Sequence, residues 1–71
     1  MTLLTLAKNI KERRDVLKIT QEQLAEMAEV GLRTLKSIEN GKGNPTIATI
    51  NKLAMVLGME LKLEVKKAGL L

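Results

Sequence analysis

The segment from Val30 to Lys52 carries four basic side chains and only one acidic side chain. Its charged residues are Arg33, Lys36, Lys42, Lys52 and, as the single acid, Glu39. Lysine and arginine donate strong hydrogen bonds to phosphate oxygens, and a planar guanidinium can also bridge two acceptors on one base. The whole chain carries a net charge of +4 and has a pI near 9.7, so an anionic partner is plausible.

The composition excludes several other kinds of chemistry. The chain has no Phe, Tyr or Trp, so bases cannot stack on aromatic rings, as most proteins that bind single strands or specific RNA sequences require. It also has no Cys and no His, which removes disulfides, the usual zinc sites, a thiol nucleophile and an imidazole base. We therefore expect no enzymatic activity, no metal and no cofactor.

Length and the first residues indicate a small cytoplasmic protein. With 71 residues the chain is one domain near the lower limit for a fold held by its core alone, and dimerisation would stabilise it. The stretch MTLLTLAKNIKERR has its basic residues after its apolar ones and contains no long apolar run. It therefore resembles neither a signal peptide nor a membrane span, and no contact with a membrane is expected.

Apolar residues with helical spacing and capping residues predict a domain of four helices over residues 1–58. The expected helices cover about residues 3–18, 21–28, 32–39 and 46–57. Thr20 followed by Gln23 has the form of a capping box, and Thr46 is a second N-cap. Gly41 and Pro45 lie in the breaker NGKGNP, which separates the last two helices.

Two charges interrupt helix faces that should be buried. Arg14 occupies an apolar position of the first helix, and Glu39 does so at the end of the third. If they form an ion pair, two costly charges are satisfied together and the two helices are linked. The alternative is two unrelated, partly exposed charges.

The helices expected at 21–28 and 32–39, joined by about four residues, have the layout of a helix-turn-helix. With Leu35 and Ile38 facing inward, the outward side of the second helix is lined by Leu32, Arg33, Lys36 and Ser37. Such a helix fits the major groove of B-DNA, which is about 12 Å wide. Helix pairs with this spacing also occur in domains that bind nothing.

Each outward residue has two interpretations. Arg33 can bridge O6 and N7 of a guanine or clamp a phosphate. Leu32 can meet a thymine methyl group or only shield the start of the helix. Lys36 and Ser37 can touch base edges or the backbone, and for Lys36 a phosphate is slightly favoured.

The motifs TQEQLA and IENGKGNPT resemble the DNA-binding domain of the Cro and phage-repressor type, also called the Xre family. The resemblance covers Leu6 to about Gly58. It implies phosphate contacts by Gln21, Asn40 and Lys42, base contacts by Leu32, Arg33, Lys36 and Ser37, and an internal ion pair between Arg14 and Glu39. The chain departs from the family at Glu29, where Gly is usual, and at Gly31, where Ser or Thr is usual.

After the fourth helix the apolar period changes from helical to alternating. Met59, Leu61, Leu63 and Val65 alternate with charged residues, which predicts a strand at about 60–66. Antiparallel pairing of two copies about Leu63 would place opposite charges against each other, so residues 59–71 are expected to form a dimerisation strand and a short tail. The dimer contacts would come from Leu61, Leu63 and Val65. The alternative is a frayed or intrachain tail.

These observations together predict an all-α domain with a C-terminal β-strand that acts as a homodimeric, sequence-specific repressor. It would bind an inverted-repeat operator in double-stranded DNA. The size and layout are similar to those of HipB-like antitoxins, which implies autorepression and a toxin as partner. The rival hypotheses are a protein-interaction module, whose helical surface binds a toxin or another protein, and a nonspecific architectural DNA binder.

Overall fold

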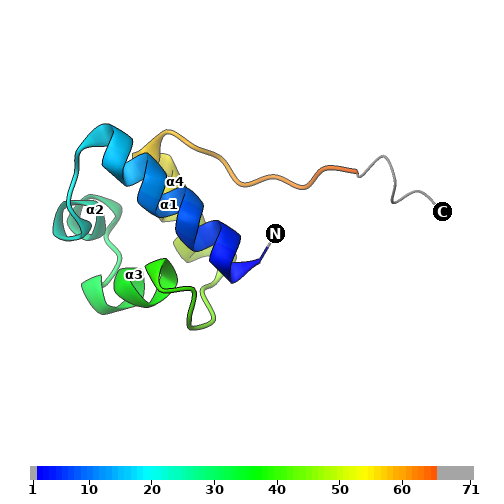
Figure 1. Cartoon of the computed structure of the whole chain (residues 1–71), viewed down its shortest axis with the longest axis horizontal. Helices are drawn as coiled ribbons and strands as arrows, with labels where there is room; N and C mark the ends of the chain where they lie inside the picture. Colours follow the sequence, from blue (N-terminus) through cyan, green and yellow to red (C-terminus); the bar gives the residue numbers. More distant parts are fainter. Residues whose placement is uncertain (1, 66–71) are drawn as a thin grey trace.

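The structure, a computed structural model, describes residues 2–65 of the chain. Figure 1 shows four helices: α1 (Leu3–Leu17), α2 (Gln21–Ala28), α3 (Leu32–Glu39) and α4 (Ile47–Leu57). These bounds agree with the predicted helices to within one residue. No helix in the described part of the chain is both long and apolar enough to cross a bilayer.

Threonine side chains begin three of the four helices. Thr2, Thr20 and Thr46 each accept a hydrogen bond from the backbone N–H three residues later, at 3.1, 3.0 and 3.1 Å. At Thr20 the bond is reciprocated, because Gln23 Oε1 accepts from the Thr20 backbone N–H at 2.8 Å. The capping box predicted from the sequence is therefore present, and it fixes where α2 begins.

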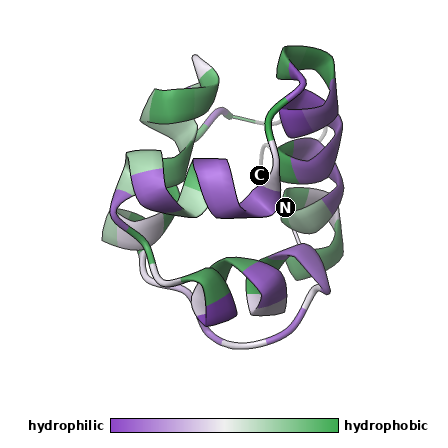
Figure 2. Ribbon diagram, turned by 90° about the vertical axis from the view of Figure 1, so that its left-hand side faces the viewer, coloured by the Kyte–Doolittle hydropathy of each residue, from purple (hydrophilic) through white to green (hydrophobic). Residues whose placement is uncertain are grey.

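The core is built from aliphatic side chains of all four helices. Leu24, Leu35, Leu53 and Leu57 are completely buried, and Leu6, Ile10 and Ile38 pack around them. Helix α1 contacts α3 and α4, while α2 also contacts both α3 and α4. Figure 2 shows hydrophobic and hydrophilic residues interleaved along the ribbon, as expected of helices with one buried face.

Two non-glycine residues end helices in the left-handed conformation. Lys18 has φ 57° and ψ 41° after α1, and Glu29 has φ 57° and ψ 43° after α2. Each backbone N–H returns to carbonyls of the last helical turn, which ends the helix sharply. At Glu29 this sharp end sets the direction in which the chain enters α3.

The predicted C-terminal strand is wrong for the described residues. From Met59 to Val65 the chain has no regular secondary structure, and residues 2–65 contain no strand; residue 66 of the predicted strand lies outside the described range. The later part of this segment extends away from the helices (Figure 1). A strand is defined by backbone hydrogen bonds to a second strand, and within residues 2–65 no other extended segment is available to provide them.

Candidate nucleic-acid interface

Helix α3 separates an apolar inner face from a basic outer face. Leu35 and Ile38 are buried, at 0% and 2% exposure, and so anchor the helix to the core. Arg33 and Lys36 lie on the outside and are exposed. Helices of this kind present long cationic side chains to solvent while their position is fixed by packing.

The two other predicted base-contacting residues are less accessible. Ser37 is half-buried, and Leu32 is half-buried because part of its side chain packs against the core. Leu32 therefore also stabilises the start of α3. Its N-cap, Gly31, makes no side-chain hydrogen bond, as expected for a glycine.

The loop after α3 is held against the end of the helix by its backbone. Asn40 N–H donates to the carbonyls of Lys36 and Ser37 at 3.1 Å each, and Lys42 N–H donates to the carbonyl of Ser37 at 2.9 Å. Gly41 has φ 71°, and a Cβ there would lie only 2.7 Å from Leu4 Cδ2. The exposed side chains of Asn40 and Lys42 are thus presented from a tightly constrained loop.

A hollow of about 340 Å³ lies between α3 and this loop. It is lined by Arg33, Thr34, Ser37, Ile38, Lys42, Gly43, Asn44 and Pro45. Gly43 has φ 81°, and a Cβ there would lie 2.9 Å from Ser37 Oγ, so glycine allows the loop to approach α3. Thr34, Gly43 and Asn44 were not expected at the site from the sequence. The only signal was position, since Gly43 and Asn44 belong to the breaker cluster and Thr34 follows Arg33 in α3.

Glu39 is the one acidic residue of α3 and the loop, and it is buried at 2% exposure. Arg14 binds it with two hydrogen bonds of 2.9 Å, from Nε to Oε2 and from Nη2 to Oε1. Arg14 Nη1 also donates to the carbonyl of Ile19 at 3.1 Å. The structure thus brings together the two charges that interrupt the apolar faces, and the hydrogen bond to Glu39 raises the pKa of Arg14 above its ordinary value.

Gln21 joins the same cluster. Its side-chain Nε2 donates to Glu39 Oε1 at 3.0 Å, and the residue is half-buried at the start of α2. From the sequence, Gln21 was expected only to contact a phosphate, and no sequence signal indicated this internal bond. The carboxylate of Glu39 therefore connects α1, α2 and α3.

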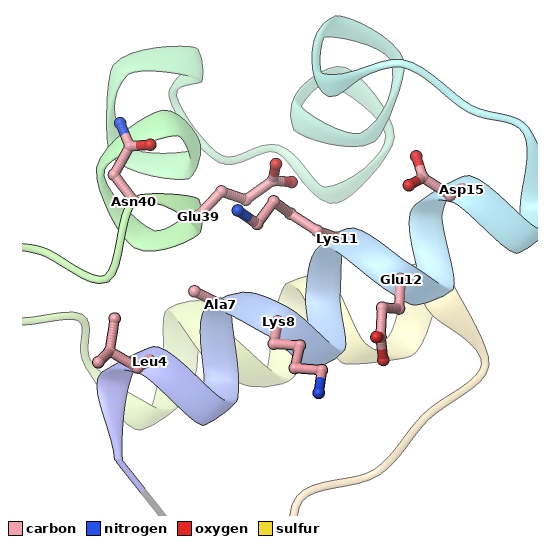
Figure 3. Close-up of a pocket in the computed structure, with 8 residues that line it drawn as sticks. All are labelled: Leu4, Ala7, Lys8, Lys11, Glu12, Asp15, Glu39 and Asn40. Carbon is pink, nitrogen blue, oxygen red and sulfur yellow. The ribbon is translucent and has the colours of Figure 1, made fainter.

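Figure 3 shows how neighbouring residues at the end of α3 diverge. Glu39 extends inward along α1 toward Lys11, whereas Asn40 points away from α1. Both line a groove of about 520 Å³ between α1 and the end of α3. Because Glu39 is buried and paired, every exposed charge from Leu32 to Pro45 is positive.

The three residues expected at a dimer interface lie beyond α4. Leu61 is half-buried and, with Met59, borders a small apolar hollow between α1 and α4. Leu63 and Val65 are almost fully exposed, at 101% and 92%. In the single chain these two aliphatic side chains are in contact with water.

Comparison with known proteins agrees with this geometry. The family model described as Helix-turn-helix matches residues 10–63. The chain is 36% identical over 58 residues to the immunity repressor protein of Bacillus phage phi105, spanning 82% of this chain and 40% of the repressor. It is 37% identical over 51 residues to an uncharacterised helix-turn-helix-type transcriptional regulator of Methanothermobacter thermautotrophicus, covering 72% of this chain and 74% of that protein.

A solved structure is also similar. The crystal structure of the restriction-modification controller protein C.AhdI from Aeromonas hydrophila superposes with a TM-score of 0.77 at 28% identity. The match covers 82% of this chain and 88% of C.AhdI. The chain therefore belongs to the helix-turn-helix family of transcriptional regulators, of the type that its motifs predicted.

Proposed function

We propose that this protein is a transcriptional repressor that binds double-stranded DNA at a specific operator through the outer face of α3. The observation that carries the proposal is the charge of α3 and its following loop. Their only acid is buried against Arg14, so Arg33, Lys36 and Lys42 present an unopposed positive surface. Such a surface attracts the phosphate backbone at long range.

The proposed contacts divide into two groups. Arg33, Lys36, Ser37 and the exposed part of Leu32 face the base edges, while Gln21, Asn40 and Lys42 contact phosphates. The hollow between α3 and the loop supports simultaneous contact by both groups, because Arg33 and Lys42 lie at the same concave surface. Phosphate contacts would fix the orientation of α3, and base contacts would supply sequence specificity.

We also propose that the protein acts as a homodimer, with residues 1–58 binding DNA and residues 59–71 contributing to the interface. The exposed side chains of Leu63 and Val65 support this, because burial of aliphatic surface is the main driving force of association. A two-fold dimer places its two recognition helices about one DNA turn, roughly 34 Å, apart. The operator would then be an inverted repeat, and the protein would act in the cytoplasm.

The test is selection of bound duplexes from a random DNA library, followed by the affinity of the selected duplexes as a function of salt. We expect enrichment of an inverted repeat with half-sites about one turn apart, and an affinity that falls steeply with salt. Salt-sensitive binding without sequence enrichment would show an architectural DNA binder instead. Absence of binding would indicate that α3 recognises a protein, with a toxin as the first candidate.

A further inference from the structure

We propose that the buried ion pair of Arg14 and Glu39 positions Gln21 for contact with DNA. Gln21 would donate one hydrogen of its amide nitrogen to Glu39 and the other to a phosphate oxygen. This inference rests on the proposed function. It gives the ion pair a part in recognition as well as in folding.

The orientation of the Gln21 amide follows from the chemistry of its partner. An ionised carboxylate only accepts hydrogen bonds, so the group facing Glu39 Oε1 at 3.0 Å must be Nε2 and not the amide oxygen. That nitrogen carries two hydrogens, and one is used by Glu39. The second has no acceptor among residues 2–65, and because Gln21 is only half-buried we assign it to an acceptor outside the chain.

Glu39 is itself held in place. Its two oxygens accept from Arg14 Nε and Nη2 at 2.9 Å, and it is 2% exposed. Arg14 is fixed in turn by the carbonyl of Ile19, just before α2 begins. A glutamine at the start of a helix normally samples several rotamers, and fixing one rotamer beforehand lowers the entropy lost on binding.

The position of Gln21 suits an anion. It is the first residue of the eight-residue helix α2, where backbone N–H groups point outward and the helix dipole is positive. A phosphate there would receive the side-chain hydrogen as well as this favourable field, against which the exposed carboxylate of Glu22 acts from the same turn. Gln21 is then the contacting residue, and Arg14 and Glu39 are positioning residues.

A double-mutant cycle on operator affinity tests the coupling. Gln21→Ala should weaken binding about ten-fold, the usual effect of losing a hydrogen bond to a charged group. The variant Arg14→Met/Glu39→Leu replaces the buried ion pair by apolar side chains, a change that proteins often tolerate. In this variant the Gln21 side chain has lost the acceptor that fixes its rotamer. In that background Gln21→Ala should cost less than about two-fold.

Salt dependence separates this contact from a charged one. Because the amide is neutral, Gln21→Ala should leave the slope of log affinity against log salt unchanged, whereas Lys42→Ala should reduce it by about 0.9. If Gln21→Ala lowers operator affinity by the same factor in the native protein and in the Arg14→Met/Glu39→Leu variant, the inference is overturned. So would unchanged affinity of Gln21→Ala in the native background.

A measurement on the unmodified protein covers the case in which the double variant does not fold. In NMR spectra of ¹⁵N-labelled protein, the chemical shift of one Gln21 side-chain amide proton should indicate a hydrogen bond to Glu39. Addition of the operator should change the chemical shift of the other amide proton. Gln23, the only other glutamine, serves as the internal control. If the operator binds and neither Gln21 proton moves, this inference fails alone; if no duplex binds, the proposed function fails.

Discussion

Glu29 adopts a backbone conformation that glycine tolerates better, with φ 57° and ψ 43°. A side chain in this left-handed region costs about 1 to 2 kcal/mol, part of which is offset by the greater flexibility of unfolded glycine. Glu29→Gly should therefore raise the free energy of unfolding by about 0.5 to 1 kcal/mol. Thermal denaturation should show an increase of a few degrees.

Glu29→Ala is the matched control, because it removes the same charge and keeps the Cβ atom. It should not reproduce the stabilisation. If the free energy of unfolding rises equally in both variants, the effect comes from removal of the acidic side chain and not from relief of backbone strain.

Glu39 and Gln21 show how far individual residues can be predicted. The charges of Arg14 and Glu39 could be paired from the sequence, because each interrupts an apolar face and each satisfies the other. The hydrogen bond from Gln21 to Glu39 could not be predicted, because it depends on how three helices pack together. It also depends on the rotamer of Gln21, which the spacing of residues in the sequence does not determine. Likewise, Leu32 was expected on the outward face, but part of its side chain packs against the core.

The loop between α3 and α4 depends on Gly43. With φ 81° and a Cβ position 2.9 Å from Ser37 Oγ, Gly43→Ala should lower stability by about 1 kcal/mol and displace the Ser37 hydroxyl. The variant should also bind the operator more weakly, because the loop and α3 form one surface. Chemical denaturation and a DNA-binding titration measure the two effects.

Gly31→Ser provides the contrast. Gly31 has φ −59°, and the atom nearest to a Cβ at this position would be Thr34 Oγ1, at an ordinary 3.7 Å. A serine N-cap there should stabilise α3 by a few tenths of a kcal/mol. A Gly43→Ala variant as stable as Gly31→Ser would show that the close approach of the loop is unimportant.

The elements differ in how well the sequence predicts them. Helices are defined by local caps and apolar spacing, so Thr20, Thr46 and Gly58 marked their ends almost to the residue. The C-terminal strand failed because alternation of apolar and charged residues indicates only which side of an extended segment is apolar. Pairing requires a second backbone, and sequence spacing does not provide one.

At the scale of the whole molecule, the described residues include two aliphatic side chains beyond α4 that are exposed to water, Leu63 and Val65. We expect the protein to form a dimer of twice its 7.8 kDa mass, and Leu63→Lys/Val65→Lys to shift it toward monomer. Analytical ultracentrifugation over a range of concentrations measures this. A native protein that stays monomeric at the highest concentrations would contradict the proposed dimer.

The control for this variant is Met27→Lys, which changes an exposed apolar residue of α2 far from Leu63 in the sequence. It should leave the mass unchanged. Loss of the dimer in both variants would point to a general effect of charge and not to an interface at the C-terminal segment.

If the outer face of α3 binds operator DNA, charge reversal at one position of this face should abolish tight binding. Arg33→Glu and Lys52→Glu make the same change in net charge at exposed residues, but only Arg33 lies on α3. Titration with the selected operator should show that Arg33→Glu lowers affinity at least 100-fold. Lys52→Glu should lower affinity only by a small factor, and added salt should remove this loss. The reason is that salt screens charges that lie farther apart than the Debye length, which is about 10 Å at 0.1 M. Equal losses of affinity in the two variants, or full affinity in Arg33→Glu, would show that the outer face of α3 does not bind the operator.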